Sequence, residues 1–433
     1  MQTIGIGLAG FGTVGAGVFK NLERNRALLS ERLGVTFDVR RIAVRDLSKK
    51  RDVEAPAALF TDRWESLIDD PSIAVVVELM GGIEIPEAFV RAAIDAGKIV
   101  ITGNKALLAE RGAELFALAH ERRVPIFYEA AVAGGIPIIK AVREAFVANH
   151  FERIDGILNG TSNYILTRMT ETGMDFHPAL VEAQNLGYAE ADPALDINGW
   201  DAAHKAIILA SLAYGCWVDT AQIRVEGIDG VTAADIRFAD DLGYRIKLIA
   251  TILADDDAGV EIRVVPTLIP KTHMLASVSG VFNAVAVHGD VVGESLFYGR
   301  GAGQDPTSSA VIADLAEAAL ALTLASPRVC YGFTPHGLYG KFRPVADSVS
   351  AYYMRLAVED RPGVLALVAG LLGENDIGIS SVIQPEWHEE GPVPLVFMIH
   401  DASYGRMQDA VKRIAALPCV KATPRLFNVE SFA

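Results

Sequence analysis

Apolar and polar positions in the first third of the chain follow two alternating periodicities. Short β-type runs at 4–9, 37–44, 73–79, 98–102 and 124–128 are separated by stretches with helical spacing at 14–29, 86–96 and 105–122. Strands that alternate with helices form parallel sheets, because each helix crosses back over the sheet before the next strand begins. The pattern therefore predicts a doubly wound α/β unit, with a ligand crevice at the carboxyl ends of its strands.

The pattern changes after about residue 150. Longer helical stretches at 162–171, 178–186 and 201–213 mix with strand-like pieces at 153–158 and 260–266. This mixture predicts a second domain of the α+β class. A helical pattern at 307–324 follows a glycine-rich turn, and we expect it to return to the first sheet. We therefore place a doubly wound domain at 1–150, with a return helix at about 303–340, and a second domain at 151–302, for which the family resemblance given below implies catalysis and dimerisation.

The last part of the chain has an order of its own. Residues 335–349 contain Gly, Pro and Ser with weak periodicity, and we interpret them as a linker. A strand (352–358), a helix (363–375), two strands (377–384 and 393–399), a helix (404–417) and a final strand follow. This β-α-β-β-α-β order is that of the ferredoxin-like fold, and it predicts a third domain at 350–433. Truncation after Pro344 is expected to leave catalysis intact.

Composition excludes several classes of protein. Half of the residues are hydrophobic (51%) and the net charge is −15, so phosphate-driven binding of nucleic acid is not expected. The cysteines Cys216, Cys330 and Cys419 lack metal-ligand spacing and are typical of a reducing compartment. The apolar stretch 206–218 is too short to span a membrane. We expect a soluble, cytoplasmic protein with no membrane partner.

A glycine fingerprint follows the first strand. Gly10, Gly12 and Gly15 permit a tight turn and a close backbone approach to a pyrophosphate, and the helix that opens at Thr13-Val14 offers amide donors. The alternative is a tight turn without a ligand. At the end of the second strand, an Arg would accept the 2′-phosphate of NADP and an acid would favour NAD. Arg45 and Asp46 are adjacent there, so the residues leave the cofactor open, with a preference for NADP.

Two further segments carry candidate chemistry. Lys105 follows the fourth predicted strand, at the rim of the crevice. Asp201 and Lys205 lie four residues apart, on one face of a helix that is apolar almost all round. A Lys at the mouth of such a helix is partly desolvated, which suits proton transfer. The alternative for this pair is an ion pair on a helix surface.

With these residues in place, the chain resembles the homoserine dehydrogenase family. The segment from Ala183 to Lys205 matches the family signature at every fixed position, through Gly187-Tyr188-Ala189-Glu190, Asp192-Pro193, Asp196, Gly199, Asp201 and Lys205. The resemblance also covers 10–15, 102–105, 130–137, 158–166 and 299–303. It departs from the family at Arg300, where relatives usually carry Pro, and at Gln304, which leaves the shape of that loop open.

The resemblance implies roles for individual residues. Lys205 would donate and accept the proton, Glu190 would hold the substrate ammonium, and Asp201 would lie beside the substrate hydroxyl. The residues implied at the NADP (or NAD) cofactor are Gly10, Gly12, Thr13, Val14, Gly15, Arg45, Lys105, Gly187 and Gly303. Family members also bind Na⁺, here through Glu129 and the backbone carbonyls of Val132, Gly134 and Ile136. Oxygen ligands of this kind suit a hard cation.

The C-terminal unit resembles the ACT family of amino-acid-sensing domains, through residues 358–365 and 375–379. An effector pocket would involve Asp360, Pro362, Gly363, Asn375 and Ile377. The family implies L-threonine as a feedback inhibitor and a homodimer or homotetramer. The alternative is that the unit serves assembly alone.

The resemblance implies reversible NAD(P)H-dependent reduction of L-aspartate 4-semialdehyde to L-homoserine, in threonine and methionine biosynthesis. Two rivals remain at this point. One is a Rossmann oxidoreductase that acts on another amino-acid aldehyde. The other is an NAD(P)-binding regulator without turnover, which would not need both Lys205 and Asp201.

Overall fold

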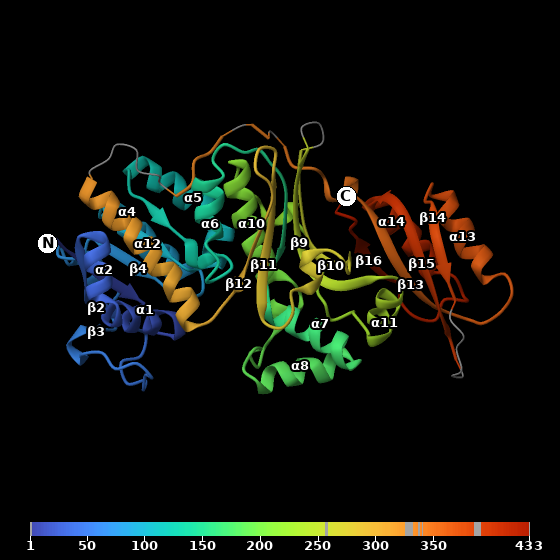
Figure 1. Ribbon diagram of the computed structural model, residues 1–433, viewed down its shortest axis with the longest axis horizontal. Helices are drawn as coiled ribbons and strands as arrows, with labels where there is room; N and C mark the ends of the chain where they lie inside the picture. The colour runs from blue at the N-terminus through green and yellow to red at the C-terminus, as the bar shows by residue number, and fades with distance from the viewer. Residues whose placement is uncertain are drawn as a thin grey trace. The chain divides into compact units, whose positions relative to one another are not determined.

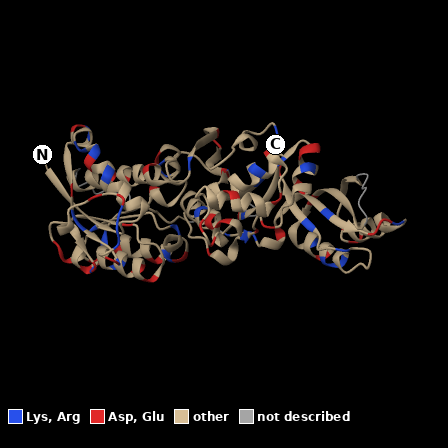
Figure 2. Cartoon of the chain, turned by 90° about the horizontal axis from the view of Figure 1, so that it is seen from below, with Lys and Arg blue, Asp and Glu red and all other residues tan. Residues whose placement is uncertain are grey.

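The computed structural model describes residues 2–255, 259–324, 332–336, 338–339, 341–384 and 391–432. The chain divides into two compact units, 1–152 with 204–221 and 283–339, and 153–203 with 222–282 and 340–433. The chain passes from one unit to the other at several points, and one of them, after residue 203, falls inside helix α10 (Trp200–Tyr214). Lys and Arg lie interspersed with Asp and Glu along the chain (Figure 2). No described helix is long and apolar enough to cross a membrane.

The first unit contains a six-stranded sheet in the order β3-β2-β1-β4-β5-β6. The strands are β1 (Gln2–Ala9), β2 (Val35–Ala43), β3 (Phe60–Thr61), β4 (Val75–Glu78), β5 (Ile99–Thr102) and β6 (Ile126–Phe127). Every neighbouring pair is parallel, and this order is that of the dinucleotide-binding Rossmann fold. The predicted doubly wound sheet is confirmed, with β3 as an additional strand of only two residues.

Helices pack on this sheet through apolar faces. They are α1 (Thr13–Arg24), α2 (Arg26–Leu33), α3 (Glu65–Asp69), α4 (Glu84–Asp95), α5 (Lys105–Arg122) and α12 (Gln304–Leu324). The one helix predicted at 14–29 is two helices, which meet at Asn25. Figure 1 shows α12, in orange, among the blue and teal elements of this unit, so the helix returns to the first sheet as expected. Part of the predicted return segment, 325–331, 337 and 340, lies outside the described residues, as does Cys330.

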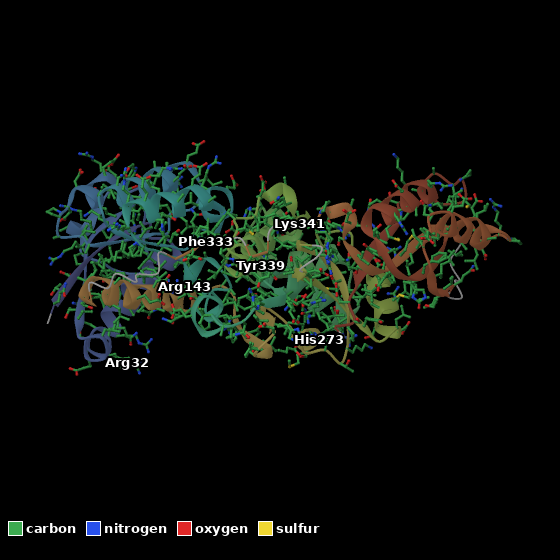
Figure 3. The ribbon with its side chains drawn as sticks, turned by 90° about the horizontal axis from the view of Figure 1, so that it is seen from above. Arg32, Arg143, His273, Phe333, Tyr339 and Lys341 are labelled. Atoms are coloured by element: carbon green, nitrogen blue, oxygen red, sulfur yellow. The ribbon has the colours of Figure 1, made fainter. Side chains whose placement is uncertain are left out.

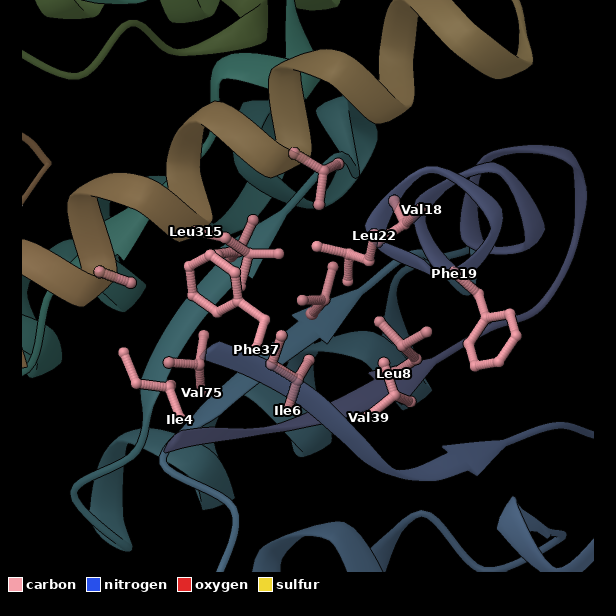
Figure 4. Close-up of a cluster of buried hydrophobic side chains, with 14 of the residues drawn as sticks. Ile4, Ile6, Leu8, Val18, Phe19, Leu22, Phe37, Val39, Val75 and Leu315 are labelled. Carbon is pink, nitrogen blue, oxygen red and sulfur yellow. The ribbon is translucent and has the colours of Figure 1, made fainter. Parts of the chain in front are cut away.

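The core of the first unit joins segments that are far apart in the sequence. Figure 4 shows Leu8 of β1, Phe19 of α1, Val39 of β2 and Val75 of β4 in one cluster with Leu315 of α12. Leu8, Val75 and Leu315 are completely buried. Complete burial of a side chain of this size contributes about 1.5–3 kcal/mol. The helix that follows the glycine turn is therefore held firmly against the strand ends that form the crevice.

The first unit also contains smaller elements. These are η1 (Ala57–Leu59), η2 (Glu129–Ala131), α6 (Ile138–Lys140), η3 (Ala141–Ala145), β11 (Phe282–Gly289) and β12 (Gly293–Arg300). The strands β11 and β12 are hydrogen-bonded neighbours. Sequence analysis did not predict either strand.

The second unit is built on a mixed sheet. Its strands are β7 (Phe151–Ile157), β8 (Arg224–Val225), β9 (Tyr244–Asp255), β10 (Gly259–Pro270), β13 (Val349–Val358), β14 (Ile379–Ile383), β15 (Val393–Ser403) and β16 (Arg425–Val429). They follow the order β7-β9-β10-β16-β13-β15-β14, and β8 pairs with β10. The helices are α7 (Gly160–Thr172), α8 (Phe176–Asn185), α9 (Ala194–Ile197), α11 (Ala233–Asp241), α13 (Val364–Glu374) and α14 (Tyr404–Ala415), with short turns η4 (Thr220–Gln222) in the first unit and η5 (Met274–Ser277) and η6 (Val345–Asp347) in the second.

The C-terminal elements have the predicted β-α-β-β-α-β order. Their strands lie in the order β16-β13-β15-β14, and all neighbours are antiparallel, as in a ferredoxin-like sheet. One edge of this sheet is not free, because β16 pairs with β10 in parallel register. Residues 341–343 also bind β10, where Val260 donates to the Lys341 carbonyl (2.9 Å). The segment interpreted as a linker is thus partly docked, and this pairing argues against the expectation that truncation after Pro344 leaves the rest intact.

Candidate functional site

The glycine turn after β1 has the shape that a phosphate ligand requires. Gly10 has φ +104°, and a Cβ there would lie 2.4 Å from the Leu79 carbonyl oxygen. A Cβ on Gly15 would lie 2.2 Å from the Gly10 carbonyl oxygen. By contrast, a Cβ on Gly12 would meet nothing within 4 Å, and Gly12 has no side chain to cap α1. The first-turn N–H groups of α1 therefore face an open position, which suits a pyrophosphate.

After β2, the two residues that could contact the ribose, Arg45 and Asp46, have different surroundings. The Asp46 carboxylate accepts hydrogen bonds from the Ser48 backbone N–H (2.8 Å) and the Ser48 hydroxyl (2.6 Å). The hydroxyl bond is the main cause that lowers the pKa of Asp46. Arg51 donates to the Asp46 carbonyl (2.5 Å) and lies over the Phe60 ring. The acid is thus engaged within its own turn, while Arg45 is exposed.

Lys105 occupies the first position of α5, and two neighbouring loops are tied together beneath it. The Asn104 side chain caps the helix by accepting from the Leu107 N–H (3.1 Å) and donates to the Gly82 carbonyl (2.8 Å). Thr102 donates to the carboxylate of Glu78 (2.6 Å) at the end of β4. Glu78 is completely buried, and burial raises its pKa. Lys105 itself is half-buried.

The loop after β6 holds a buried carboxylate. Glu129 is 4% exposed, and its two oxygens accept from the N–H groups of Ile139 (3.0 Å) and Lys140 (2.9 Å). Its own N–H donates to Asp314 of α12 (2.9 Å). Burial raises the pKa of Glu129 to about 7, and burial also raises that of Asp314. A carboxyl group in such a place favours a nearby cation.

One cation, Arg143, contributes favourable electrostatics at this carboxylate. Arg143, labelled in Figure 3, donates to Glu317 (2.5 Å). Ala133 and Gly134 both have positive φ (54° and 53°), so the chain turns sharply at the predicted carbonyl ligands. The Ile136 carbonyl accepts from Ile138 (2.8 Å). Across the described part of the chain, no group of three or more His, Cys, Asp or Glu side chains could hold a metal ion.

The turn at 299–303 packs tightly on this loop. Gly135 donates to the Arg300 carbonyl (3.0 Å), and a Cβ on Gly134 would lie 2.4 Å from the Gly301 carbonyl oxygen. Gly303 has φ +122° and precedes Gln304, the first residue of α12. The Gln304 side chain accepts from Lys20 of α1 (3.1 Å). Both residues that depart from the family pattern make contacts in this turn. Arg300 accepts through its backbone carbonyl, and Gln304 contacts α1 through its side chain.

In the second unit, the first turn of α7 organises the signature segment. The Asn159 side chain donates to the carboxylates of Asp196 (2.7 Å) and Asp201 (2.8 Å). Thr161 donates to the Tyr188 carbonyl (2.7 Å), and Ser162 donates to the Asp196 carbonyl (2.7 Å). The signature segment is therefore fastened to α7 at several points along its length.

The remaining predicted residues of the signature lie in the loop after α8 and in helix α10. Gly187 has φ +74° in the turn after α8, and Glu190 is exposed on the loop that follows. Asp201 is in the first turn of α10, and Lys205 follows one turn later with only 8% exposure. A buried Lys is costly in free energy unless its ammonium group has a hydrogen-bonding or charged partner.

Sequence reasoning passed over three residues that the structure places among these groups. Asn159 and Asp196 belong to quoted motifs but received no role, although an Asn before a Gly-Thr-Ser helix start is an N-cap signal. Glu78 is the first charged residue after the apolar run Val75–Val77, and an acid at the carboxyl end of a buried parallel strand is a signal that could have identified it.

The fold and these groups define a class of protein. A Rossmann sheet with an open glycine turn is the arrangement of a dinucleotide-binding protein. Two family models match the chain, "Homoserine dehydrogenase, NAD binding domain" at residues 10–129 and "Homoserine dehydrogenase" at residues 137–316.

Whole-chain comparisons agree with these models. A homoserine dehydrogenase of Pseudomonas aeruginosa is 45% identical over 99% of this chain and 99% of its own length. The crystal structure of a homoserine dehydrogenase from Thiobacillus denitrificans is similar with a TM-score of 0.93 and 42% identity, over 100% of this chain and 99% of that one. A hyperthermophilic archaeal homoserine dehydrogenase in complex with NADPH has a TM-score of 0.62 and 27% identity, over 76% of this chain and 100% of that one. The chain belongs to the homoserine dehydrogenase family of NAD(P)-dependent oxidoreductases.

Proposed function

We propose that the protein catalyses the reversible reduction of L-aspartate 4-semialdehyde to L-homoserine, a cytoplasmic step of threonine and methionine biosynthesis. The observation that carries this proposal is the signature segment, in which a buried Lys205 follows Asp201 by one turn of α10. The bound nicotinamide supplies the hydride to the aldehyde carbon in one direction and accepts it in the other. The protein's own residues bind the amino acid, hold its geometry and move one proton.

Each of the three residues has a distinct task in this proposal. The Lys205 ammonium donates a proton to the carbonyl oxygen as the hydride adds to carbon, so the aldehyde becomes an alcohol, and in reverse Lys205 accepts that proton. Asp201 lies beside the same oxygen and orients it. Glu190, an exposed carboxylate, holds the substrate ammonium by charge.

An assay with separate cofactors tests the proposal. L-homoserine is offered with NAD⁺ and with NADP⁺, and the absorbance of the reduced nicotinamide is followed. Turnover of homoserine is expected, and no turnover of related 3-hydroxy amino acids such as serine at the same concentration. Reduction of neither cofactor with homoserine would contradict the proposed reaction.

We propose NADP as the preferred cofactor, bound by Gly10, Gly12, Thr13, Val14, Gly15, Arg45, Lys105, Gly187 and Gly303. The hydrogen bonds of Asp46 with Ser48 support this choice, because they hold one oxygen of the acid that would favour a free ribose hydroxyl within its own turn. Arg45 remains exposed at the same turn and offers the planar donor group that suits a phosphate.

We also propose that Na⁺ binds beside Glu129. The implied donors, one buried carboxylate with the carbonyls of Val132, Gly134 and Ile136, are all oxygens and therefore fit a hard cation in kind. The Ile136 carbonyl already accepts one hydrogen bond, but a carbonyl oxygen has a second lone pair. The expected result is faster turnover in NaCl than in choline chloride at equal ionic strength, and equal rates would refute the site.

For the C-terminal part we propose an ACT role, with functional divisions of the chain near residues 150, 302 and 350. Gly363 has φ +92° and opens α13, while Asn375 closes it. The helix has eleven residues and is about 16 Å long. The turn at Asp360, Pro362 and Gly363 therefore cannot share one small amino acid with Asn375 and Ile377 of the same copy.

A second copy would solve this geometric problem. If the α13 helices of two copies run antiparallel, the turn of one faces Asn375 of the other. Exposed apolar side chains on α13 support such a contact, because Leu365 and Leu367, which lie on different sides of the helix, are 44% and 47% exposed. We propose a homodimer or homotetramer in which L-threonine binds between copies and inhibits. Inhibition at millimolar L-threonine by the full-length enzyme is expected, and its absence would leave assembly as the only role.

A further inference from the structure

One buried side chain connects three helices of the second unit. Asn159 is 5% exposed and uses both ends of its amide. Its oxygen accepts from the Ser162 N–H (2.7 Å) and so caps α7. Its nitrogen donates to Asp196 of α9 (2.7 Å) and to Asp201 of α10 (2.8 Å). The orientation of the amide follows from this network, because only the oxygen can accept from a backbone N–H.

Helix capping alone does not require an asparagine here. An N-cap needs one side-chain oxygen, which Ser, Thr or Asp supplies about equally well. Of these residues, only Asn combines that oxygen with a nitrogen that carries two N–H donors. The two donors are both used on carboxylates, so the choice of Asn is explained by the carboxylates and not by the helix.

The amide also solves an electrostatic problem. Two carboxylates on either side of one nitrogen repel each other. Lys or Arg at this place would pair with Asp201 and neutralise its charge. A neutral amide donates to both carboxylates without adding a charge of its own.

The start of α7, where Asn159 lies, is packed closely against the segment 278–281. A Cβ on the next residue, Gly160, would lie 2.7 Å from the Val281 carbonyl oxygen, so the start of α7 fits closely against that segment. Asn163, one turn later, donates to the carbonyls of Val278 (3.2 Å) and Gly280 (3.0 Å). A donor on such a support holds Asp201 in one orientation.

We propose that Asn159 is a positioning residue of the reaction, which sets the orientation of the Asp201 carboxylate by bridging it to Asp196. This inference rests on the role proposed above for Asp201. It predicts that loss of the two amide donors lowers kcat, while helix capping and cofactor binding remain.

The test separates the cap from the bridge. Asn159→Ser keeps an oxygen that can cap α7 and removes both amide N–H groups that bind the carboxylates. The expected result is a fall in kcat of about 10- to 100-fold, the range for loss of a hydrogen bond to a charged group. The Kd for NADP⁺ should stay near that of the wild type. Because loss of these hydrogen bonds also costs stability, kcat is compared well below the melting temperatures of both proteins. Asn198→Ser is the matched control, since Asn198 is exposed and its side chain accepts from the Trp200 N–H at the start of α10 (3.1 Å); this variant should keep wild-type kcat.

A second variant and a double-mutant cycle complete the design. Asn159→Asp keeps the size and the cap but places a third carboxylate beside the other two, so its kcat should fall below that of Asn159→Ser. In an Asp201→Asn background, Asn159→Ser should have much less additional effect, because the group that it positions is gone.

The outcomes distinguish this inference from the proposed function. Wild-type kcat in Asn159→Asp, or an equal effect of Asn159→Ser with and without Asp201, would overturn the positioning role. A fall in kcat that follows only the fall in melting temperature would do the same, and Asn159 would then be a cap. Full activity of Asp201→Asn would instead overturn the role proposed for Asp201 itself.

Discussion

A buried carboxylate, Glu430, joins the C-terminal strand β16 to the strands β7 and β10. Removal of its charge should destabilise the second unit. Glu430 follows β16 and its side chain is 9% exposed. It pairs with Arg153 of β7 (2.8 Å) and with Arg263 of β10, whose side chain is 3% exposed. We consider Glu430→Gln, which keeps the shape and removes the charge.

The size of the effect follows from burial. Removal of one partner from a buried ion pair costs about 3–5 kcal/mol, because the other charge stays in a medium of low polarity. Arg263 also pairs with Glu261, and Gln can still accept one hydrogen bond, so we expect the lower end, about 3 kcal/mol. For a unit of this size, 1 kcal/mol shifts the melting temperature by about 2–4 °C. The predicted fall is therefore about 6–12 °C.

The same charge predicts a dependence on pH. Burial raises the pKa of Glu430, but the guanidinium groups of Arg263 and Arg153 together lower it by more than burial raises it. The pKa of Glu430 is therefore lowered overall. A carboxylate with a lowered folded pKa stabilises the fold fully above its unfolded pKa, about 4.3, and loses this contribution as the pH falls through the folded value. The difference in melting temperature between the wild type and Glu430→Gln should be constant from about pH 6 to 8 and should shrink in acid.

Differential scanning calorimetry at several pH values measures both effects. Glu374→Gln is the matched control, because Glu374 pairs with Arg413 on the surface of the same C-terminal part with its side chain 61% exposed. Exposed pairs of this kind contribute little to stability. If Glu430→Gln melts at the same temperature as Glu374→Gln at pH 7, the argument from the buried network is refuted.

Three further predictions concern the candidate site. Lys205→Ala should lower kcat by about 10²–10⁴-fold with little change in cofactor Kd, as steady-state kinetics and fluorescence titration can measure; retention of more than about half of kcat would contradict proton transfer by Lys205. Arg45→Ala should raise the KM for NADP⁺ far more than that for NAD⁺, and an equal change for both would return Arg45 to an ordinary surface charge. Gly10→Ala should abolish tight binding of either cofactor, because its Cβ would lie 2.4 Å from the Leu79 carbonyl oxygen and φ +104° is strained for alanine; wild-type affinity by titration would show that the turn does not bind the pyrophosphate.

Much of the first unit could be predicted from the sequence, because its signals are local. The strands at 4–9 and 98–102 are buried on both faces and form apolar runs, and α5 has both the predicted bounds, 105–122. The glycine fingerprint is local too, since a positive φ and a close approach of backbone select glycine at individual positions. The signature at 183–205 could be identified for the same reason, because its loop residues are specified one by one.

Only the tertiary structure decided which distant segments meet. The strands β9, β11 and β12 were missed for another reason, because β9 pairs with the next strand β10 and β11 pairs with the next strand β12, so their partners are close in the sequence. The pairing of β16 with β10 and the ion pair of Glu430 with Arg263 join residues more than 150 positions apart. The bridge of Asn159 to Asp201 has the same origin, since an amide chosen for two carboxylates cannot be distinguished in the sequence from one chosen to cap a helix. Local patterns report burial and backbone conformation, whereas the partner of a polar group is settled by packing.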